Sequence, residues 1–166
     1  MRRTWAPRGQ TPILHTRTRH RRRVSAIGGL SISPARRRLN WYLAFHKDLS
    51  IRQEQVITFL RDLLRHLPGP IVVVWDHLQA HQSKLLRRWL QRGRRIHLEF
   101  LPGYAPELNP NEFGWSYLKG GQHLANFCPD DIDELHATVL VAAADARSNQ
   151  SLLRSFVRGT KLPIRL

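Results

Sequence analysis

The sequence holds a single cysteine, no acidic residue in its first 47 positions, and no long apolar run. With Cys128 alone, a disulfide framework and a multi-cysteine zinc site are excluded, and a reducing compartment is indicated. Apolar runs such as Ile71 to Trp75 fall far short of the roughly 20 residues that span a bilayer. No apolar stretch follows the basic start of the chain, so no secretory signal is predicted. These absences predict a cytoplasmic protein with no membrane partner.

Positive charge dominates instead. Among 166 residues, 27 Lys and Arg stand against 12 Asp and Glu, which gives a net charge of +15 and a pI near 11.6. Such an excess predicts a polyanionic partner, most often nucleic acid. Arginine clusters at 17–23 and 36–38 precede the first carboxylate, Asp48. Any acidic catalytic group must therefore lie at or beyond Asp48.

The chain is long enough for one domain, and 42% hydrophobic residues are enough to bury a core. Residues 1–21 combine basic side chains with Pro7, Gly9 and Pro12. They are predicted to form an extended or loop segment, with a short strand at Thr11 to His15. Residues 22–166 are predicted to form the domain.

Local patterns predict a hairpin followed by alternating helices and strands. Strand signals cover 23–32 and 39–46, and the Gly28–Gly29 pair in the first strand indicates a bulge or a close approach. Ser50, with Gln53 three residues later, predicts a capping box that opens a helix ending before Pro68.

The second half continues the alternation. Residues 71–75 are apolar at every position, as in a central strand buried on both faces. A helix over 83–91, with Leu85 among its inward residues, precedes a strand over 96–101. Further helices are predicted over 110–119, 129–147 and 152–157. The whole order predicts an α/β fold, a mixed sheet flanked by helices.

Two carboxylates stand at positions where chemistry is common. Asp76 ends the apolar strand, although it could equally cap the turn that follows. Glu112 follows Asn109 and Pro110, a pattern that fits a helix start closed by a capping box. The same pattern could aim Glu112 at Asp76, and converging carboxylates are what Mg²⁺ or Mn²⁺ require. His81, considered alone, is more often a hydrogen-bonded loop histidine than a ligand.

Two segments together carry a family resemblance. GPIVVVWDHLQAHQS, followed by LEFLPGYAPELNPNEFGWSYLK, resembles the catalytic domain of mariner-superfamily DDE transposases, in the branch of bacterial insertion sequences. Thirty-five residues separate Asp76 from Glu112, which agrees with that family. RRTWAPRGQTP, SAIGGLS, CPDDIDELHA and LLRSF are similar as well, so the resemblance covers nearly the whole chain.

The resemblance implies a ribonuclease H-like fold and a DNA transposase. Its reaction would be divalent-metal-dependent phosphodiester cleavage and strand transfer at transposon ends, with Mg²⁺ or Mn²⁺ as cofactor. Inverted-repeat ends and target DNA would be the partners, and a homodimer associated with the bacterial nucleoid is expected.

Site residues transfer by position in the two motifs. Asp76 matches the second catalytic acid and Glu112 the third, both as metal ligands, and His81 matches the histidine downstream of the second acid. Glu107 is the acidic member of the loop that does not bind metal in that alignment. Supporting or DNA-contacting roles are expected for five positions: His81, Lys119, Arg21, Arg22 and Arg23. The alternative for the three arginines is a solvated hairpin base.

Several departures from the family matter. The first catalytic Asp and its strand are absent from these 166 residues, as is the helix-turn-helix region, and Asp48 cannot replace the missing acid without rearrangement. His77 stands where Asn is usual, Gln79 where Pro is common, and Asn111 where an apolar residue is usual. We therefore expect impaired catalysis from this chain alone. The alternatives are a non-catalytic basic DNA-binding remnant, a repurposed domain, or one part of an enzyme completed by frameshifting or an upstream start.

Overall fold

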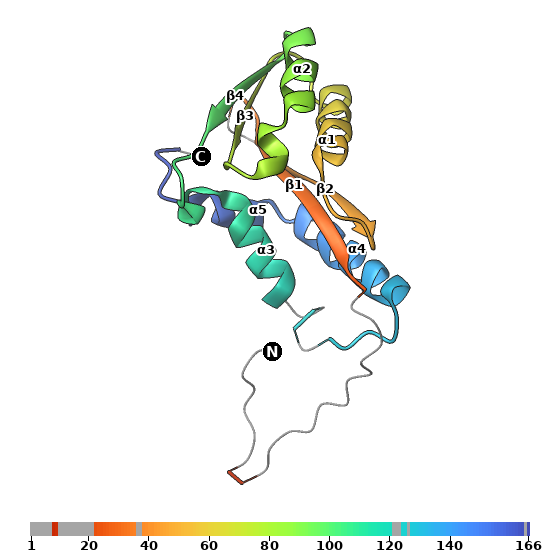
Figure 1. Ribbon diagram of the computed structural model, residues 1–166. Helices are drawn as coiled ribbons and strands as arrows, with labels where there is room; N and C mark the ends of the chain where they lie inside the picture. Colours follow the sequence, from red (N-terminus) through yellow and green to blue (C-terminus); the bar gives the residue numbers. More distant parts are fainter. Residues whose placement is uncertain (1–7, 10–21, 36–37, 121–123, 126, 165) are drawn as a thin grey trace.

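The computed structural model describes residues 8–9, 22–35, 38–120, 124–125, 127–164 and 166. In chain order the elements are β1 (Val24–Ile32), β2 (Leu39–Lys47), α1 (Gln53–His66), β3 (Ile71–Trp75), η1 (Gln79–Gln82), α2 (Lys84–Arg92), β4 (Ile96–Phe100), η2 (Pro106–Leu108), α3 (Pro110–Gly120), α4 (Ile132–Ser148) and α5 (Gln150–Arg158) (Figure 1). The predicted α/β alternation is confirmed. The strand predicted at Thr11 to His15 lies outside the described residues. Among the described helices, none has the length and apolar character to cross a membrane.

Strands β1 and β2 form the predicted hairpin, antiparallel and in continuous register from Val24 opposite Lys47 to Ile32 opposite Leu39. The register contains no bulge, so the glycine pair marks a close approach of another element, which is the second predicted alternative. A Cβ added at Gly28 would lie 2.8 Å from Cη2 of Trp115. Gly28 therefore allows α3 to approach the hairpin closely.

Strands β3 and β4 pair in parallel, from Ile71 opposite Ile96 to Trp75 opposite Phe100. Within the described residues they form a sheet separate from the hairpin, so β1 and β3 each keep one edge without a partner strand. The prediction of a strand buried on both faces is wrong, because Val72 and Val74 are 62% and 53% exposed. Helices α1 and α2 cover only the face of the strand that carries Val73 and Trp75.

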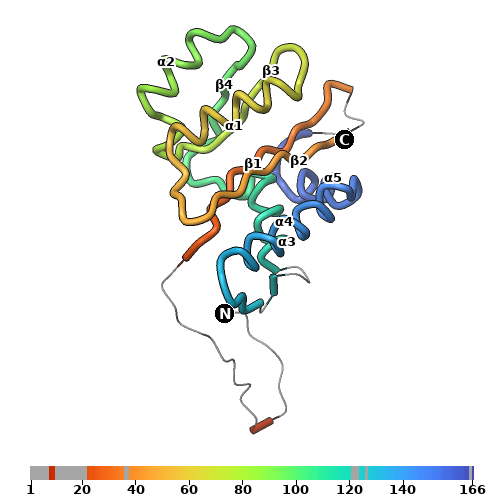
Figure 2. The backbone as a smooth tube through the Cα atoms, turned by 90° about the vertical axis from the view of Figure 1, so that its right-hand side faces the viewer, coloured from red at the N-terminus to blue at the C-terminus, as the bar shows by residue number. Residues whose placement is uncertain are grey.

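The buried side chains form two clusters. A lower cluster joins β2 to α3, α4 and α5, and contains Leu39, Trp41, Leu118, Ala142, Ala146, Leu153, Phe156 and Val157. An upper cluster joins α1 to β3 and α2, and contains Val56, Ile57, Leu60, Trp75 and Leu86. The hairpin lies between them, with α1 on one side and α3, α4 and α5 on the other (Figure 2).

Two local predictions on α1 and α2 need correction. Helix α1 begins at Gln53, not at Ser50, because the Arg52 backbone N–H donates to Gln55 Oε1 at 2.9 Å. The Ser50 hydroxyl instead accepts a hydrogen bond from the Arg23 guanidinium. On α2, Leu85 is 45% exposed, since the inward face is filled by Leu86 with Trp89 and Leu90 beside it.

Helix α4 begins at Ile132, three residues later than predicted, because Asp131 is its N-cap. The Asp131 carboxylate accepts from the backbone N–H groups of Asp133 and Glu134, each at 2.8 Å. Asp133 and Glu134 in the first turn lie near the positive end of the helix dipole and stabilise this start further.

Candidate active site

Asp76 follows directly after β3, and its two carboxylate oxygens differ in what they bond. Oδ1 accepts from the Leu78 backbone N–H at 3.1 Å and lies 2.9 Å from His81 Nδ1. Oδ2 has no hydrogen-bond partner among the described residues, and the side chain is 44% exposed. The turn-capping role and the ligand role are therefore compatible, because one oxygen holds the turn while the other stays open.

His81 is held on two sides. Its ring stacks on Trp75 with centroids 4.5 Å apart and planes 6° from parallel. Its backbone N–H donates to the Leu78 carbonyl at 2.9 Å, and only 17% of its side chain is exposed. With the ring fixed in this way, Nδ1 is directed at Asp76 Oδ1 and limits rotation of that carboxylate. No sequence pattern predicts this stack, because the strand-end tryptophan and the loop histidine belong to no common periodicity.

His77, in the position where the family has Asn, points elsewhere. Its ring stacks on Phe100 at a centroid distance of 4.9 Å, and its carbonyl accepts from Gln82 Nε2 at 2.9 Å. The residue thus tightens the turn after β3 and joins it to the end of β4.

Glu112 lies in the first turn of α3, on an exposed face. Asn109 caps this helix, since its side-chain oxygen accepts from the Asn111 N–H at 3.1 Å. The capping box is not closed, because the Asn109 N–H donates to the Pro106 carbonyl at 3.0 Å instead of to Glu112. The Glu112 carboxylate has no hydrogen-bond partner among the described residues, which leaves both of its oxygens open for a ligand.

Trp41 fixes the position of α3. Its indole Nε1 donates to Asn111 Oδ1 at 2.9 Å, and a Cβ added at Gly114 would lie 2.7 Å from its Cη2. Leu118, 5% exposed, packs in the same cluster, and the Trp115 ring lies 5.6 Å from that of Trp41. The departure at Asn111 is thus explained, since its side chain satisfies a buried indole N–H. Trp115 and Leu118 therefore anchor α3 in the lower cluster.

The two acids stand on different parts of the molecule. Asp76 extends a strand of the upper cluster, whereas Glu112 stands on a helix of the lower one. The loop after β4 leads through η2 into α3, so the start of α3 follows the carboxyl ends of the parallel strands (Figure 1). Among the described residues, no group of three or more His, Cys, Asp or Glu could hold a metal ion. Asp76 and Glu112 therefore offer two hard oxygen donors, the right type for Mg²⁺ but fewer than a full set.

Some of the basic side chains that are predicted to contact DNA already form hydrogen bonds or ion pairs within the chain. Arg22 Nη2 lies 2.7 Å from Asp48 Oδ2, and this hydrogen bond holds the pKa of the Asp48 carboxyl below its ordinary value. Arg23 bonds Ser50, and Arg21 lies outside the described residues. Lys119 is exposed in the last turn of α3. Their roles toward DNA stay predictions.

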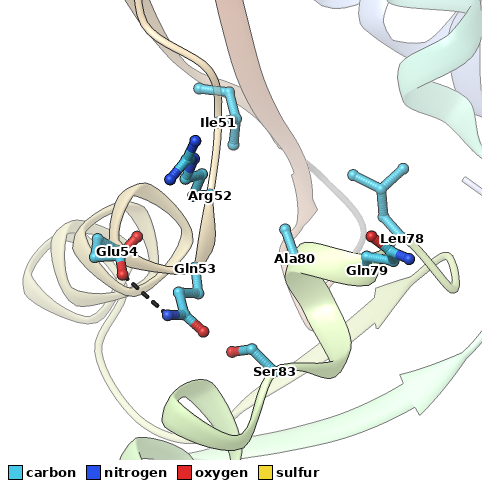
Figure 3. A pocket seen from close by; sticks show the side chains of 8 residues that line it. All are labelled: Ile51, Arg52, Gln53, Glu54, Leu78, Gln79, Ala80 and Ser83. Atoms are coloured by element: carbon cyan, nitrogen blue, oxygen red, sulfur yellow. Dashed lines mark hydrogen bonds between the residues drawn. The ribbon is translucent and has the colours of Figure 1, made fainter.

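An open hollow of about 640 Å³ lies beside the turn after β3 (Figure 3). The start of α1 and the η1 segment line it with Ile51, Arg52, Gln53, Glu54, Leu78, Gln79, Ala80 and Ser83. The hydrogen bond drawn there joins Gln53 Nε2 to Glu54 Oε1 at 3.0 Å. Neither Asp76 nor Glu112 lines this hollow, so it is not the candidate catalytic site.

Comparison with known families is specific: residues 1–136 match the model of the DDE superfamily endonucleases. The chain belongs to this family.

Among solved structures, the chain is similar to one in the crystal structure of the Mos1 strand transfer complex, with a TM-score of 0.57 and 18% identity. The match covers 95% of this chain and 45% of that one, so the chain spans less than half the length of its structural relative. The predicted ribonuclease H-like fold is confirmed by this similarity. No curated protein matches the chain.

Proposed function

We propose that this chain is part of the catalytic domain of a DNA transposase, which cleaves phosphodiester bonds and transfers strands at transposon ends. The observation that carries the proposal is the pair Asp76 and Glu112. By the resemblance of the sequence, both match acidic positions of the family motifs, and both present carboxylate oxygens that no described residue bonds.

Mg²⁺ or Mn²⁺ is the proposed cofactor, with Asp76 Oδ2 and Glu112 as its ligands. Bound there, it would polarise the phosphate and lower the pKa of an attacking water or hydroxyl. His81 is proposed as a positioning residue, since its Nδ1 lies 2.9 Å from Oδ1 while no described residue bonds Oδ2. Outer partners of this kind typically change metal affinity by about 10–100-fold when removed.

DNA is the proposed partner. The family match, the net charge of +15 and the similarity to a strand transfer complex support it. We propose inverted-repeat ends as the specific DNA, a homodimer as the working state and the bacterial nucleoid as the location. Arg21, Arg22, Arg23 and Lys119 stay candidate contacts.

Only two acids of the family's three stand at matching positions in these 166 residues. We therefore expect weak metal binding and poor nicking of inverted-repeat DNA by the purified chain. Robust divalent-dependent nicking would contradict this expectation.

Metal titration tests the site even where turnover is slow. Mn²⁺ binding, followed by the loss of its free electron paramagnetic resonance signal, should weaken at least about tenfold in Asp76→Asn and in Glu112→Gln, because each removes a ligand charge. His81→Phe keeps a ring beside Trp75 but loses the bond to Asp76, so a smaller loss is expected. Glu107→Gln is the matched control, an exposed carboxylate five positions before Glu112. Equal binding by all variants would reject the site.

The competing function is non-catalytic DNA binding. In that case Asp76→Asn would leave every measurable property toward DNA unchanged, and charge reversal at Arg21 to Arg23 would matter more. In the transposase case Asp76→Asn removes any divalent-dependent nicking and leaves DNA binding in EDTA nearly intact.

A further inference from the structure

Helix α2 carries an unusual arrangement of charge. Lys84, Arg87, Arg88 and Arg92 recur at the spacing that places them along one face of the helix, and all four are exposed. Within the part of the chain that the structure describes, none of their side chains has an ion-pair or hydrogen-bond partner. The opposite face carries Leu86 into the upper cluster.

No carboxylate lies between Asp76 and Glu99 to balance this face. The longer helices α1 and α4 differ: α1 pairs Arg65 with Asp62, and α4 contains Asp133, Glu134 and Asp145. Arg95, just after α2, is different again, because its guanidinium donates to the Gly69 and Leu64 carbonyls, each at 3.0 Å. Arg95 therefore has a structural role, whereas the α2 face has no described function in the fold.

The arrangement also costs the helix stability. Lys84 and Arg88, and Arg88 and Arg92, are like charges at i and i+4, each pair destabilising by about 0.2–0.5 kcal/mol. An anion bound across this face would remove that repulsion. The four cations extend over about 12 Å of helix, and over that length of duplex axis one DNA strand carries about three to four phosphates, at about 3.4 Å of axis per phosphate.

We infer that the outer face of α2, formed by Lys84, Arg87, Arg88 and Arg92, binds the phosphate backbone of duplex DNA. This inference rests on the proposed function for its choice of DNA as the polyanion. The contact is independent of sequence and of metal, since it uses only side-chain cations and phosphate. It brings DNA to the helix that follows the Asp76 turn in the chain.

Arg88→Glu gives the sharpest test, because it should separate folding from binding. The acid introduced at this position would stand four residues before Arg92 and four after Lys84, which replaces two repulsive pairs by attractive ones. We expect the melting temperature to stay the same or rise. Binding to a fluorescein-labelled duplex of arbitrary sequence, measured by anisotropy in EDTA, should weaken about tenfold, and the slope of log K against log salt should fall by about one.

Arg147→Glu is the matched control. Arg147 is exposed on α4, has no described partner, and lies on a helix well separated from α2 (Figure 1). The inference holds if Arg88→Glu loses affinity and slope while Arg147→Glu stays close to the unmodified chain; Arg87→Gln with Arg88→Gln should repeat the loss without introducing an acid. Equal losses in both reversals, an unchanged slope, or tighter binding to phosphatidylglycerol vesicles than to the duplex would overturn it. Because EDTA removes metal, failure here would leave the Mn²⁺ titration of Asp76 and Glu112 unaffected.

Discussion

At the scale of single residues, the carboxylates divide into those held by a cation and those left open. Asp48 is held by Arg22, and Asp133 by Lys47, and in both cases the hydrogen bond from the cation lowers the carboxyl pKa. Asp76 and Glu112 have no Lys or Arg partner among the described residues. Asp48 and Asp133 are thus already paired with a cation within the chain, whereas no described Lys or Arg pairs with the two motif acids.

Asp48 predicts a pH dependence of stability. Its pKa in the folded chain lies below the ordinary value of 3.8, so its contribution is present above that value and is lost as pH falls through the lowered pKa. Asp48→Asn should reduce the free energy of unfolding at neutral pH, and this difference from the unmodified chain should shrink as the solution is acidified below the ordinary pKa. Asn also tolerates the left-handed φ of 50° at this position.

Urea unfolding followed by circular dichroism at a series of pH values measures this difference. Glu107→Gln serves as control, an exposed carboxylate without a described partner, and should show no such change with pH. A difference for Asp48→Asn that is constant through the acid range would show that the ion pair is not the cause.

Residue identities were predictable where they belong to a spaced motif. The family was predictable from two spaced motifs, and the match over residues 1–136 confirms it. The roles of Asp76 and Glu112, which 35 residues separate, rest on the same motifs and stay predictions. Their surroundings were not predictable, because the contacts join residues with no regular spacing. Trp75 on His81 and Trp41 to Asn111 arise from tertiary packing, which a single sequence does not encode in any local pattern.

At the scale of elements, α3 is the helix with the tightest placement. Gly114 faces the Trp41 ring, which is 1% exposed and packed between Trp115 and Phe156. The ring has no room to shift, so the closeness of α3 to the hairpin depends on the missing side chain at Gly114.

Gly114→Ala should therefore destabilise the protein. Alanine is favoured over glycine inside a helix by about 1 kcal/mol, but overpacking a well-packed core costs about 1–3 kcal/mol. With a Cβ 2.7 Å from Trp41 Cη2, the steric cost wins, and we expect a net loss of about 1–2 kcal/mol. Urea unfolding measures it, with Gly103→Ala as control because no atom lies within 4 Å of its added Cβ. A more stable Gly114→Ala would show that α3 can move away from the hairpin.

Element types followed from periodicity, whereas boundaries and burial did not. Helices over 53–66 and 110–120 agree with the spacing of their apolar residues. The exposure of Val72 and Val74 could not be predicted. An apolar run shows which side chains favour burial, but it does not show whether another part of the chain packs against them. The predicted start of α1 was wrong because two capping patterns overlap, Ser50 with Gln53 and Arg52 with Gln55. The side chain of Gln55 forms the capping hydrogen bond that was expected from Gln53.

At the scale of the whole molecule, both sheets have only two strands among the described residues, so each of the four strands presents one unpaired edge. Unpaired strand edges with apolar side chains promote association with other chains. Val72 and Val74 add an apolar face beside one of these edges.

Val74→Lys should reduce self-association at high protein concentration, because an edge lysine opposes strand pairing. The side chain is 53% exposed, so the fold should tolerate the charge. Val141→Lys on α4 is a closely matched control with the same 53% exposure but no strand edge. Light scattering against concentration should fall for Val74→Lys and stay unchanged for Val141→Lys. Equal effects of the two substitutions would attribute the change to net charge alone.

The two hydrophobic clusters meet along β1, which contributes Ile27 to the upper one and Leu30 and Ile32 to the lower one, with Gly28 and Gly29 between. Asp76 depends on the upper cluster and Glu112 on the lower. A cation held by both carboxylates would therefore join two packed units that otherwise share one glycine-containing strand. If the proposed site holds a cation, its binding free energy would add to the cooperativity of unfolding, and metal binding would be linked to the all-or-none character of the folding transition through Asp76 and Glu112.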